Sequence, residues 1–408
     1  MNYKKLVPKS SFIGQYMEYM SVVETAEAYD FWCALWAIGV GCGRDVYVDR
    51  PNSPVFLNWY IILAAEAGVT RKSTAISSIR SLVSGHGKIL AGRTSPESLE
   101  LLLHESSRKD GDARADFAVS ELVTVLGKEG YLAGMPGLLT DLYDCPKERR
   151  SPGTLKSGEI IQHNVYVTFL SASTPSWLVT AINPSVIEGG FTSRVMFIVD
   201  DERKRAIAWP ELREEGARER LLQGYESTIN AGRSLLSGIS ISVGGLGTLR
   251  KWYNNRATHN DPFLSSFEAR EDDHVLRLAA CLSINDGILE LQSKHIKTAI
   301  KIISSVKLKS NRLFGGDFSA TAKLTGAIGR IRTILIEAGA DGIKHSDLQR
   351  RVVRHVDAKE LRLLMNIMHE CNMISIFKMK RGEMYRATQA IEKFGVTSEV
   401  LSKMNLKD

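Results

Sequence analysis

The chain has 408 residues, of which 44% are hydrophobic and 24% are charged; this is typical of an ordinary soluble protein with two or three domains. The net charge of +7 is compatible with a polyanionic partner but does not require one. The five cysteines are scattered, with no Cys-x-x-Cys pair and no histidine at ligand spacing. This pattern argues against a disulfide framework and against a zinc site, and it favours a reducing cytoplasm.

Residues 1–54 show apolar residues at near-helical spacing, and we expect a helical segment here. The apolar run Phe31–Cys42 is too short to cross a bilayer, so we interpret it as a core helix. The first residues lack the apolar core of a signal peptide. We therefore expect no association with a membrane.

The next segment predicts a phosphate-binding loop. An apolar run over residues 55–63 is typical of a buried strand, and a helical pattern begins near Lys72. In such a strand–loop–helix unit, Lys72 would reach the β- and γ-phosphates and Ser73 would ligate Mg²⁺. The candidate nucleotide-binding residues are Gly68, Val69, Thr70, Arg71, Lys72, Ser73 and Thr74.

This loop departs from the pattern G-x-x-x-x-G-K-[ST]. Glu66 stands at the position of its first glycine and Arg71 at that of its second, so only Gly68 remains to relieve the loop. The alternative interpretation is an ordinary turn between a strand and a helix that happens to contain a lysine.

A second apolar strand, over residues 116–121, ends in a carboxylate. In many ATPases an Asp-Glu pair ends this strand, and the glutamate activates the attacking water. Here Ser120 replaces the aspartate, and Glu121 is the candidate general base. The alternative is a surface glutamate at the start of a helix. Before this strand we expect a helix over 96–104 and a polar, exposed connection over 106–115.

Residues 145–162 predict a hairpin rich in cations, because turn signals at Pro152-Gly153 and Ser157-Gly158 lie among Arg149, Arg150 and Lys156. The hairpin contacts a nucleic-acid backbone in one interpretation and is a solvated loop in the other.

Two further strands complete the pattern of an α/β sheet. Residues 165–170 form a buried strand followed by polar residues, and residues 195–199 form another. Polar side chains at the tip of a central strand point toward the ligand of the loop after the first strand. Arg194, at the entrance of the last strand, is a candidate phosphate-sensing arginine.

Beyond Pro210 the pattern is mainly helical. After a linker near Phe314, three helices and a two-stranded hairpin predict a winged helix. Its expected DNA-binding residues lie on the third helix and in the wing: Lys359, Arg362, Lys378, Lys380 and Arg381. Winged helices also serve as protein-docking modules, and this alternative stays open.

The order of these motifs resembles the core of AAA+ ATPases, and most closely the MCM and superfamily 3 replicative helicases and the helicase-like ATPases of phages, prophages and genomic islands. Ser193-Arg194 is similar to the MCM arginine finger, and Thr174 stands where MCM proteins carry the sensor-1 asparagine. Arg270 is similar to the sensor-2 arginine of the MCM lid. The hairpin is placed where these helicases insert their DNA-translocating hairpin, which implies that Lys156 is the pore residue.

The resemblance covers roughly residues 10–310 and implies a ring-forming ATPase, expected to be a homo-hexamer, that uses ATP and Mg²⁺. It would translocate on or unwind DNA in the replication of a phage or other mobile element, with a primase or initiator as a further partner. Single-stranded DNA would pass through the ring pore and duplex would bind the winged helix. The expected segments are a helical N-terminal segment (1–54), an AAA+ P-loop core (55–210), a helical lid (211–318), a winged helix (319–390) and a tail (391–408).

Two other functions stay open. The first alternative is a DNA-binding replication initiator that is switched by nucleotide but does not unwind DNA. The second, which the sequence favours less, is a winged-helix transcription regulator with an ATPase sensor.

Overall fold

The structure is a computed structural model in which the chain divides into two compact units, Met1–Leu313 and Phe314–Asp408. The described residues are 1–68, 70–126, 134–151, 159–182, 186, 189–200, 206–235, 238–259, 261–314, 330–352, 358–370, 372–379 and 382–388. The residues named above that lie outside this part of the chain are Val69, Pro152, Gly153, Lys156, Ser157, Gly158, Lys380 and Arg381.

A five-stranded parallel sheet forms the centre of the first unit. Its strands, in spatial order, are β4 (Ile89–Leu90), β5 (Arg114–Val119), β8 (Tyr166–Ser173), β3 (Tyr60–Ala64) and β9 (Val195–Val199). Every residue of β3 is buried, as expected for a central strand whose sheet is covered on both faces. The predicted α/β class is therefore correct at the level of a mixed fold with a parallel sheet flanked by helices.

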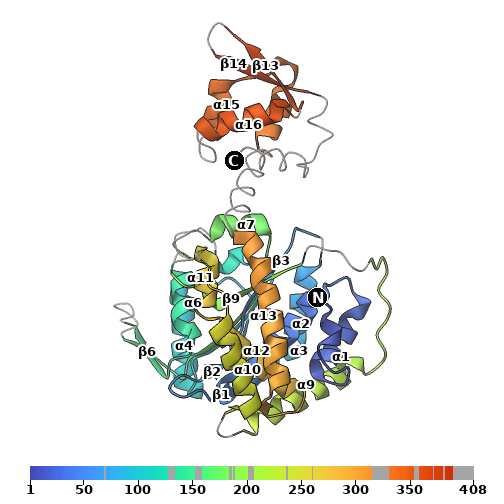
Figure 1. Ribbon diagram of the computed structural model, residues 1–408, viewed down its shortest axis with the longest axis vertical. Helices are drawn as coiled ribbons and strands as arrows, with labels where there is room; N and C mark the ends of the chain where they lie inside the picture. Colours follow the sequence, from blue (N-terminus) through green and yellow to red (C-terminus); the bar gives the residue numbers. More distant parts are fainter. Residues whose placement is uncertain are drawn as a thin grey trace. The chain divides into compact units, whose positions relative to one another are not determined.

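Helices cover both faces of this sheet because successive right-handed crossovers run in opposite directions along it (Figure 1). The chain crosses from β3 to the far edge through α3 (Lys72–Val83), which packs beside α2 (Glu27–Cys42). It then returns through α4 (Pro96–Asp110) and α6 (Met135–Tyr143) on the other face.

Helix α2 explains the apolar run near the N-terminus. All of its residues except Glu27 are buried, so the expectation of a core helix over residues 31–42 is confirmed. Trp32 packs edge-on against Trp59 at the start of the central strand, with ring centroids 5.3 Å apart. A helix that is apolar on all sides is stable in water only when other elements surround it. Here α1 (Phe12–Tyr19) and α9 (Ala217–Arg233) complete that cover.

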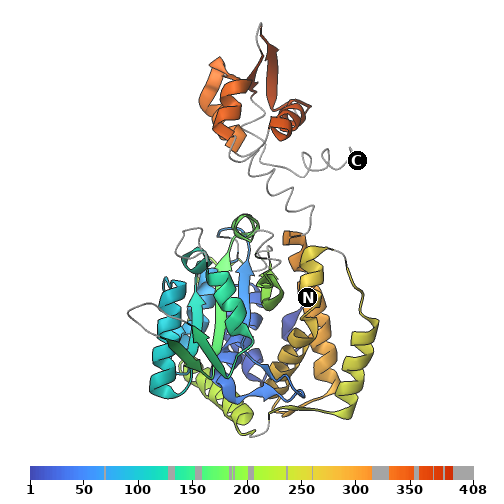
Figure 2. The ribbon, with the colours of Figure 1, turned by 90° about the vertical axis from the view of Figure 1, so that its left-hand side faces the viewer.

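The C-terminal helices of the first unit form a layer beside the sheet (Figure 2). They are α10 (Val243–Asn255), α11 (Pro262–Glu268), α12 (Glu271–Asn285) and α13 (Ser293–Phe314). A short parallel pair, β10 (Ser240–Ile241) and β11 (Glu290–Leu291), joins α10 to the end of α12. No helix among the described residues combines the length and the apolar character that a bilayer span requires.

The strand expected over residues 55–63 is in fact two strands. β2 (Val55–Phe56) pairs antiparallel with β1 (Tyr47–Val48), whereas β3 joins the central sheet. Between them the Asn58 side chain donates a hydrogen bond to the carbonyl of Tyr143 at 2.6 Å. The break lies within a continuous buried run, so hydrophobic pattern alone does not reveal it.

The expected exposed connection over residues 106–115 is also wrong. Helix α4 continues to Asp110, and strand β5 begins already at Arg114. Ser106 and Ser107 are buried, and their hydroxyls bond neighbouring backbone groups. Ser106 donates to the carbonyl of Asp112, just before β5, at 2.6 Å, and Ser107 accepts the N–H of His163 at 2.8 Å. Polar side chains that satisfy local backbone groups resemble a loop in the sequence.

The hairpin predicted over residues 145–162 has two described strands, β6 (Glu148–Ser151) and β7 (Ile160–His163), which pair antiparallel. Its tip is outside the described residues.

The second unit contains a three-stranded antiparallel sheet in the order β12 (Ile343–Lys344), β14 (Glu383–Ala387), β13 (Ile374–Lys378). Residues 330–338, α15 (His345–Val352) and α16 (Ala358–Glu370) are helical. Their apolar faces form one buried cluster that includes Leu335, Leu348 and Leu364.

The close contact between α2 and the chain before β3 gives a test of this packing. A Cβ added at Gly39 would lie 2.3 Å from the carbonyl oxygen of Leu57, whereas one at Gly247 in α10 would meet nothing within 4 Å. Gly39→Ala should lower the free energy of unfolding by about 1–3 kcal/mol, measured by urea denaturation. The same change at Gly247 should raise it by roughly 0.5–1 kcal/mol, because glycine is unfavourable inside a helix. Equal effects at the two positions would contradict this packing.

Candidate functional site

The loops that follow three neighbouring parallel strands line one cavity of about 440 Å³. Gly68 and Arg71–Thr74 follow β3, and Ser120 and Glu121 follow β5. Ser173 is the last residue of β8, and Thr174 comes directly after it. Carboxyl ends of parallel strands share one edge of a sheet, and ligands of open α/β sheets bind beyond that edge, where the strand order reverses. β3 lies at such a point, between β8 and β9.

Lys72 is the first residue of α3 and lies across the loop that precedes it. Its Nζ donates hydrogen bonds to the carbonyls of Ala65 at 2.6 Å and Glu66 at 3.0 Å. Partial burial lowers the pKa of this amine. Among the described residues no side chain caps α3, and its first turn carries no acid, so its first N–H groups and Lys72 together favour an anion.

Arg71 adopts the left-handed conformation for which the phosphate-loop pattern uses glycine, with φ 50° and ψ 41°. This conformation costs an ordinary residue about 1–2 kcal/mol. The Arg71 guanidinium donates two hydrogen bonds, at 3.1 and 3.0 Å, to one carboxylate oxygen of Glu24. Glu24 is only 7% exposed, and its other oxygen accepts the N–H of Ile207 at 2.8 Å. A side chain from outside the loop thus contacts the residue that replaces the second glycine.

Glu121 is exposed at the cavity, and its carboxylate accepts no hydrogen bond from a described residue. It is the single carboxylate among the described residues that line the cavity, where Arg71 and Lys72 are the cations. Thr174 also lies here, but its hydroxyl caps α7 (Pro175–Ala181) by accepting the N–H of Trp177 at 3.4 Å. The cavity thus combines one acid, one lysine and an uncapped helix N-terminus.

Arg194 and Arg270 do not line this cavity. Arg194 directly precedes β9, whose first residue pairs with Tyr60 at the start of β3. It therefore occupies the amino edge of the sheet, whereas Lys72 follows the carboxyl edge. The intervening strand is five residues long, or roughly 16 Å. One protomer consequently does not bring these arginines to its own loop.

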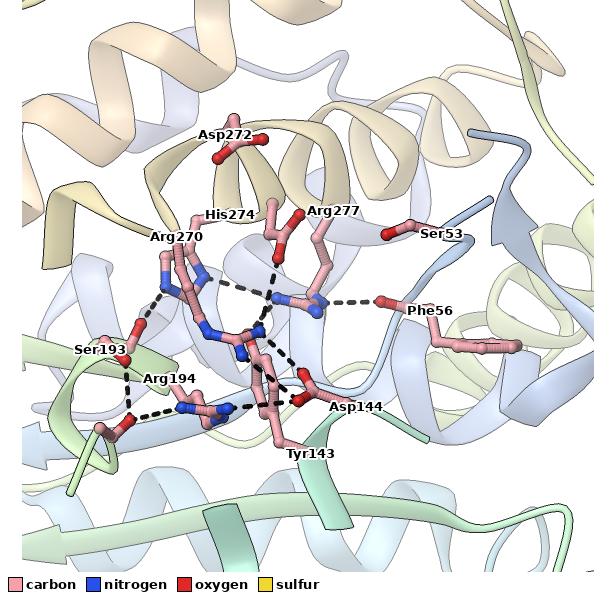
Figure 3. A network of polar contacts seen from close by, with 12 residues as sticks. Ser53, Phe56, Tyr143, Asp144, Ser193, Arg194, Arg270, Asp272, His274 and Arg277 are labelled. Carbon is pink, nitrogen blue, oxygen red and sulfur yellow. Dashed lines mark hydrogen bonds and ion pairs between the residues drawn. The ribbon is translucent and has the colours of Figure 1, made fainter. Parts of the chain in front are cut away.

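Both arginines instead contact Asp144, which follows α6 (Figure 3). Nη2 of Arg194 donates to Asp144 at 3.2 Å, and Arg270 donates two hydrogen bonds to it at 2.8 and 3.3 Å. A second cavity, of about 520 Å³, opens beside this cluster. Its lining includes Arg44, Arg50, Asp144, Arg270, Asp273 and Arg277.

His274 and Arg277 connect the elements that carry the two arginines. The Nε2–H of buried His274 donates to the carbonyl of Ser193 at 2.8 Å, which leaves Nδ1 facing Arg277 at 3.5 Å. Burial, and next the charge of Arg277, lower the pKa of His274 to about 3. Burial alone would lower the pKa of Arg277. The charges of Tyr143 and Asp273 outweigh this effect, so the net pKa of Arg277 is raised.

The other predicted cations are dispersed. Arg149 pairs with Glu100 at 2.7 Å, and Arg150 pairs with Glu148 at 2.7 Å and Glu159 at 3.5 Å. These carboxylates neutralise the described base of the hairpin. In the second unit, Lys359 and Arg362 are exposed on α16, and Lys378 is exposed at the end of β13.

Comparison with known proteins does not identify this site: no protein-family model matches the chain, and no curated protein matches it. Within the described part of the chain, no three histidine, cysteine or acidic side chains are grouped as metal ligands would be. The argument for function therefore rests on the geometry of the two edges of the sheet.

Sequence reasoning missed three residues of this arrangement: Glu24, Asp144 and His274. Each acts on a partner that is distant in sequence, at separations of 47, 126 and 81 residues. None lies in a local pattern that signals its role.

The lowered pKa of His274 predicts how stability depends on pH. A histidine that stays neutral in the folded state opposes protonation, so unfolding takes up a proton between the unfolded pKa near 6.5 and the folded pKa of about 3. The contribution of His274 to the free energy of unfolding is fully present above pH 6.5 and is lost as the pH falls. Between pH 7 and pH 5, His274 should account for a loss of about 2 kcal/mol.

Chemical denaturation at the two pH values measures this effect. In His274→Asn the decrease should be smaller than in the wild type by that amount. In the control His369→Asn, an exposed histidine in the last turn of α16, the decrease should match the wild type. Identical decreases in all three proteins would show that His274 takes up its proton in the folded state.

Proposed function

We propose that the chain is an AAA+-type ATPase that assembles into a ring and uses ATP and Mg²⁺ to translocate on or unwind DNA during replication of a mobile element. The observation that carries the proposal is the single cavity in which Lys72, Ser73 and Glu121 meet, at the carboxyl edge of a parallel sheet.

The side chains in this cavity fit a nucleotide with its magnesium ion. Lys72 and the first N–H groups of α3 would hold the β- and γ-phosphates. The Ser73 hydroxyl supplies the hard oxygen donor that Mg²⁺ prefers, and Glu121 adds a carboxylate on the facing loop. Bound Mg²⁺ would neutralise charge on the transferring phosphoryl group. Glu121 would orient a water molecule and accept its proton, for which an unpaired carboxylate at the cavity is suited.

Catalysis in this proposal needs a second protomer. Arg194 and Arg270 lie at the amino edge of the sheet and converge on one point, so they would serve the nucleotide of a neighbour. An arginine supplied in this way is worth roughly 10³–10⁵ in rate.

The second unit supports a DNA partner. Its helices followed by a β-hairpin have the element order of a winged helix, and exposed Arg362 and Lys378 lie on the third helix and on the hairpin. In the proposal these cations contact duplex phosphates, while the β6–β7 hairpin contacts single-stranded DNA in the pore.

One observation favours the alternative of an initiator that binds nucleotide but does not unwind DNA. Ser120 stands beside Glu121, so the cavity has one carboxylate among its described lining residues. Without a second acid near the metal, nucleotide would bind more readily than it is hydrolysed.

Substitution of the two cavity residues tests the enzyme. Lys72→Ala should abolish detectable binding of ATP, measured by calorimetry, because it removes the cation that contacts the phosphates. Glu121→Gln should retain binding and lower turnover roughly 10²- to 10⁴-fold, the contribution of a general base. Glu105→Gln makes the same change at an exposed residue of α4 outside the cavity and should leave turnover unchanged. Wild-type turnover in Glu121→Gln would exclude Glu121 as the base.

Salt dependence tests the second unit in the full chain. Each phosphate contact contributes about 0.9 to the slope of log affinity against log salt. Removing two contacts in Arg362→Ala/Lys378→Ala should therefore reduce the slope for duplex DNA by about two. Binding of ATP should not change, because both residues lie outside the first unit. An unchanged slope would favour a protein-docking role for this unit.

A further inference from the structure

Asp144 differs from the arginines that it contacts in how firmly it is held. Its side chain is 52% exposed, whereas those of Arg194 and Arg270 are 11% and 25% exposed. Both guanidinium groups lie near the Tyr143 ring, at 5.7 and 5.8 Å from its centroid, and Arg194 also donates to the carbonyl of Gly190 at 2.9 Å. The arginines are thus fixed by the protein body, and Asp144 is the solvent-facing member of the cluster.

The cluster carries more positive than negative charge. Arg277 is buried and donates to neutral groups, the Tyr143 hydroxyl, the Phe56 carbonyl and the Asn58 side chain. Asp272 and Asp273 both pair with Arg50, and Asp273 also lies 3.7 Å from Nη1 of Arg270. Among the described residues, Asp144 is therefore the one carboxylate paired with Arg194, and it is shared with Arg270. An anion with more oxygens than a carboxylate would satisfy both guanidinium groups better.

We propose that the guanidinium groups of Arg194 and Arg270 form a binding site for a phosphate group, and that Asp144 occupies this site in the isolated protomer. The inference rests on the proposed function, because the phosphate is the terminal group of a nucleotide held by the loop of a second copy of this chain. Asp144 then competes with the neighbour's nucleotide, and assembly requires its carboxylate to withdraw from the two arginines.

Withdrawal of Asp144 has a low cost. Ion pairs that face solvent contribute little to stability, because water replaces the contacts of an exposed carboxylate. The competing phosphate gains two arginines that are already oriented, and such pairs favour bidentate hydrogen bonds. Asp144 pairs with both arginines in the protomer alone and yields to an anion of higher charge.

The direct test uses inorganic triphosphate as the probe and the full chain with Lys72→Ala, so that the protein's own loop does not bind it. In this background Asp144→Asn should tighten binding of triphosphate about five- to tenfold, measured by calorimetry. Adding Arg194→Ala or Arg270→Ala should abolish the gain. Asp141→Asn, the same charge change at an exposed position of α6, should alter binding less than twofold.

Binding that is unchanged or weaker in Asp144→Asn, in a protein whose unfolding midpoint matches its parent, would overturn the inference. In that case Asp144 only orients the arginines.

A second measurement separates this inference from the proposed function. In the otherwise unchanged chain, Asp144→Asn should lower the protein concentration at which ATPase activity per subunit is half-maximal. If triphosphate binds more tightly but no variant hydrolyses ATP, the anion site stands and the proposed enzyme fails. If ATP is hydrolysed but Asp144→Asn weakens triphosphate binding, the enzyme stands and the inference fails.

Discussion

The burial of β3 between two parallel neighbours is the constraint on which the rest of the first unit depends. Because β8 and β9 both run parallel to it, everything that follows these strands gathers at one edge, and everything that precedes them gathers at the other. Lys72, Glu121 and Thr174 follow strands, whereas Arg194 precedes one. The polarity of a single sheet therefore divides the candidate chemistry into a cavity with a lysine and an acid, and a cluster of arginines.

The N-terminal helices hold the root of the loop after β3. The Tyr29 hydroxyl on α2 lies 2.9 Å from the carbonyl of Ala64 at the end of β3 and 2.9 Å from that of Asp200 after β9. Thr70, within the loop, donates to the same hydroxyl at 3.4 Å. Glu24, just before α2, holds Arg71. These contacts come from a segment outside the sheet and reach both Thr70 and Arg71 of the loop.

Sequence alone predicted the features that depend on local pattern. Apolar runs located the central strands and the buried helix α2, and the residue types after each strand located Lys72 and Glu121 at one edge. It did not find the short strand β4, whose two residues are too few to show a period. It also merged β2 with β3, because both lie in one buried run.

The parts that sequence did not predict are contacts between residues that are distant along the chain. Arg149 and Arg150 looked like free cations in a basic hairpin, but Glu100 on α4 and Glu148 and Glu159 on the hairpin neutralise them. The residues adjacent to Asp144 in the sequence form no pattern that predicts its role, because its partners Arg194 and Arg270 are distant along the chain. Side-chain pairing of this kind depends on the register of the finished sheet, and a pattern of residue types does not contain that register.

The cavity at the carboxyl edge of the sheet and the arginines at the amino edge carry groups that complement each other. This complementarity is the basis of the proposed assembly. The cavity at the carboxyl edge presents a lysine, hydroxyls and a carboxylate, which in the proposal bind and activate phosphates, but, within the described lining, no arginine from the amino edge. The amino edge presents oriented arginines whose one acidic partner in common, Asp144, faces solvent. A protomer alone satisfies its arginines with its own carboxylate. If copies associated edge to edge, as proposed, each cavity would receive the arginines that its own sheet holds about a strand length away. Because this distance separates the arginines from the cavity of their own chain, hydrolysis of a nucleotide in the cavity would depend on a neighbouring copy.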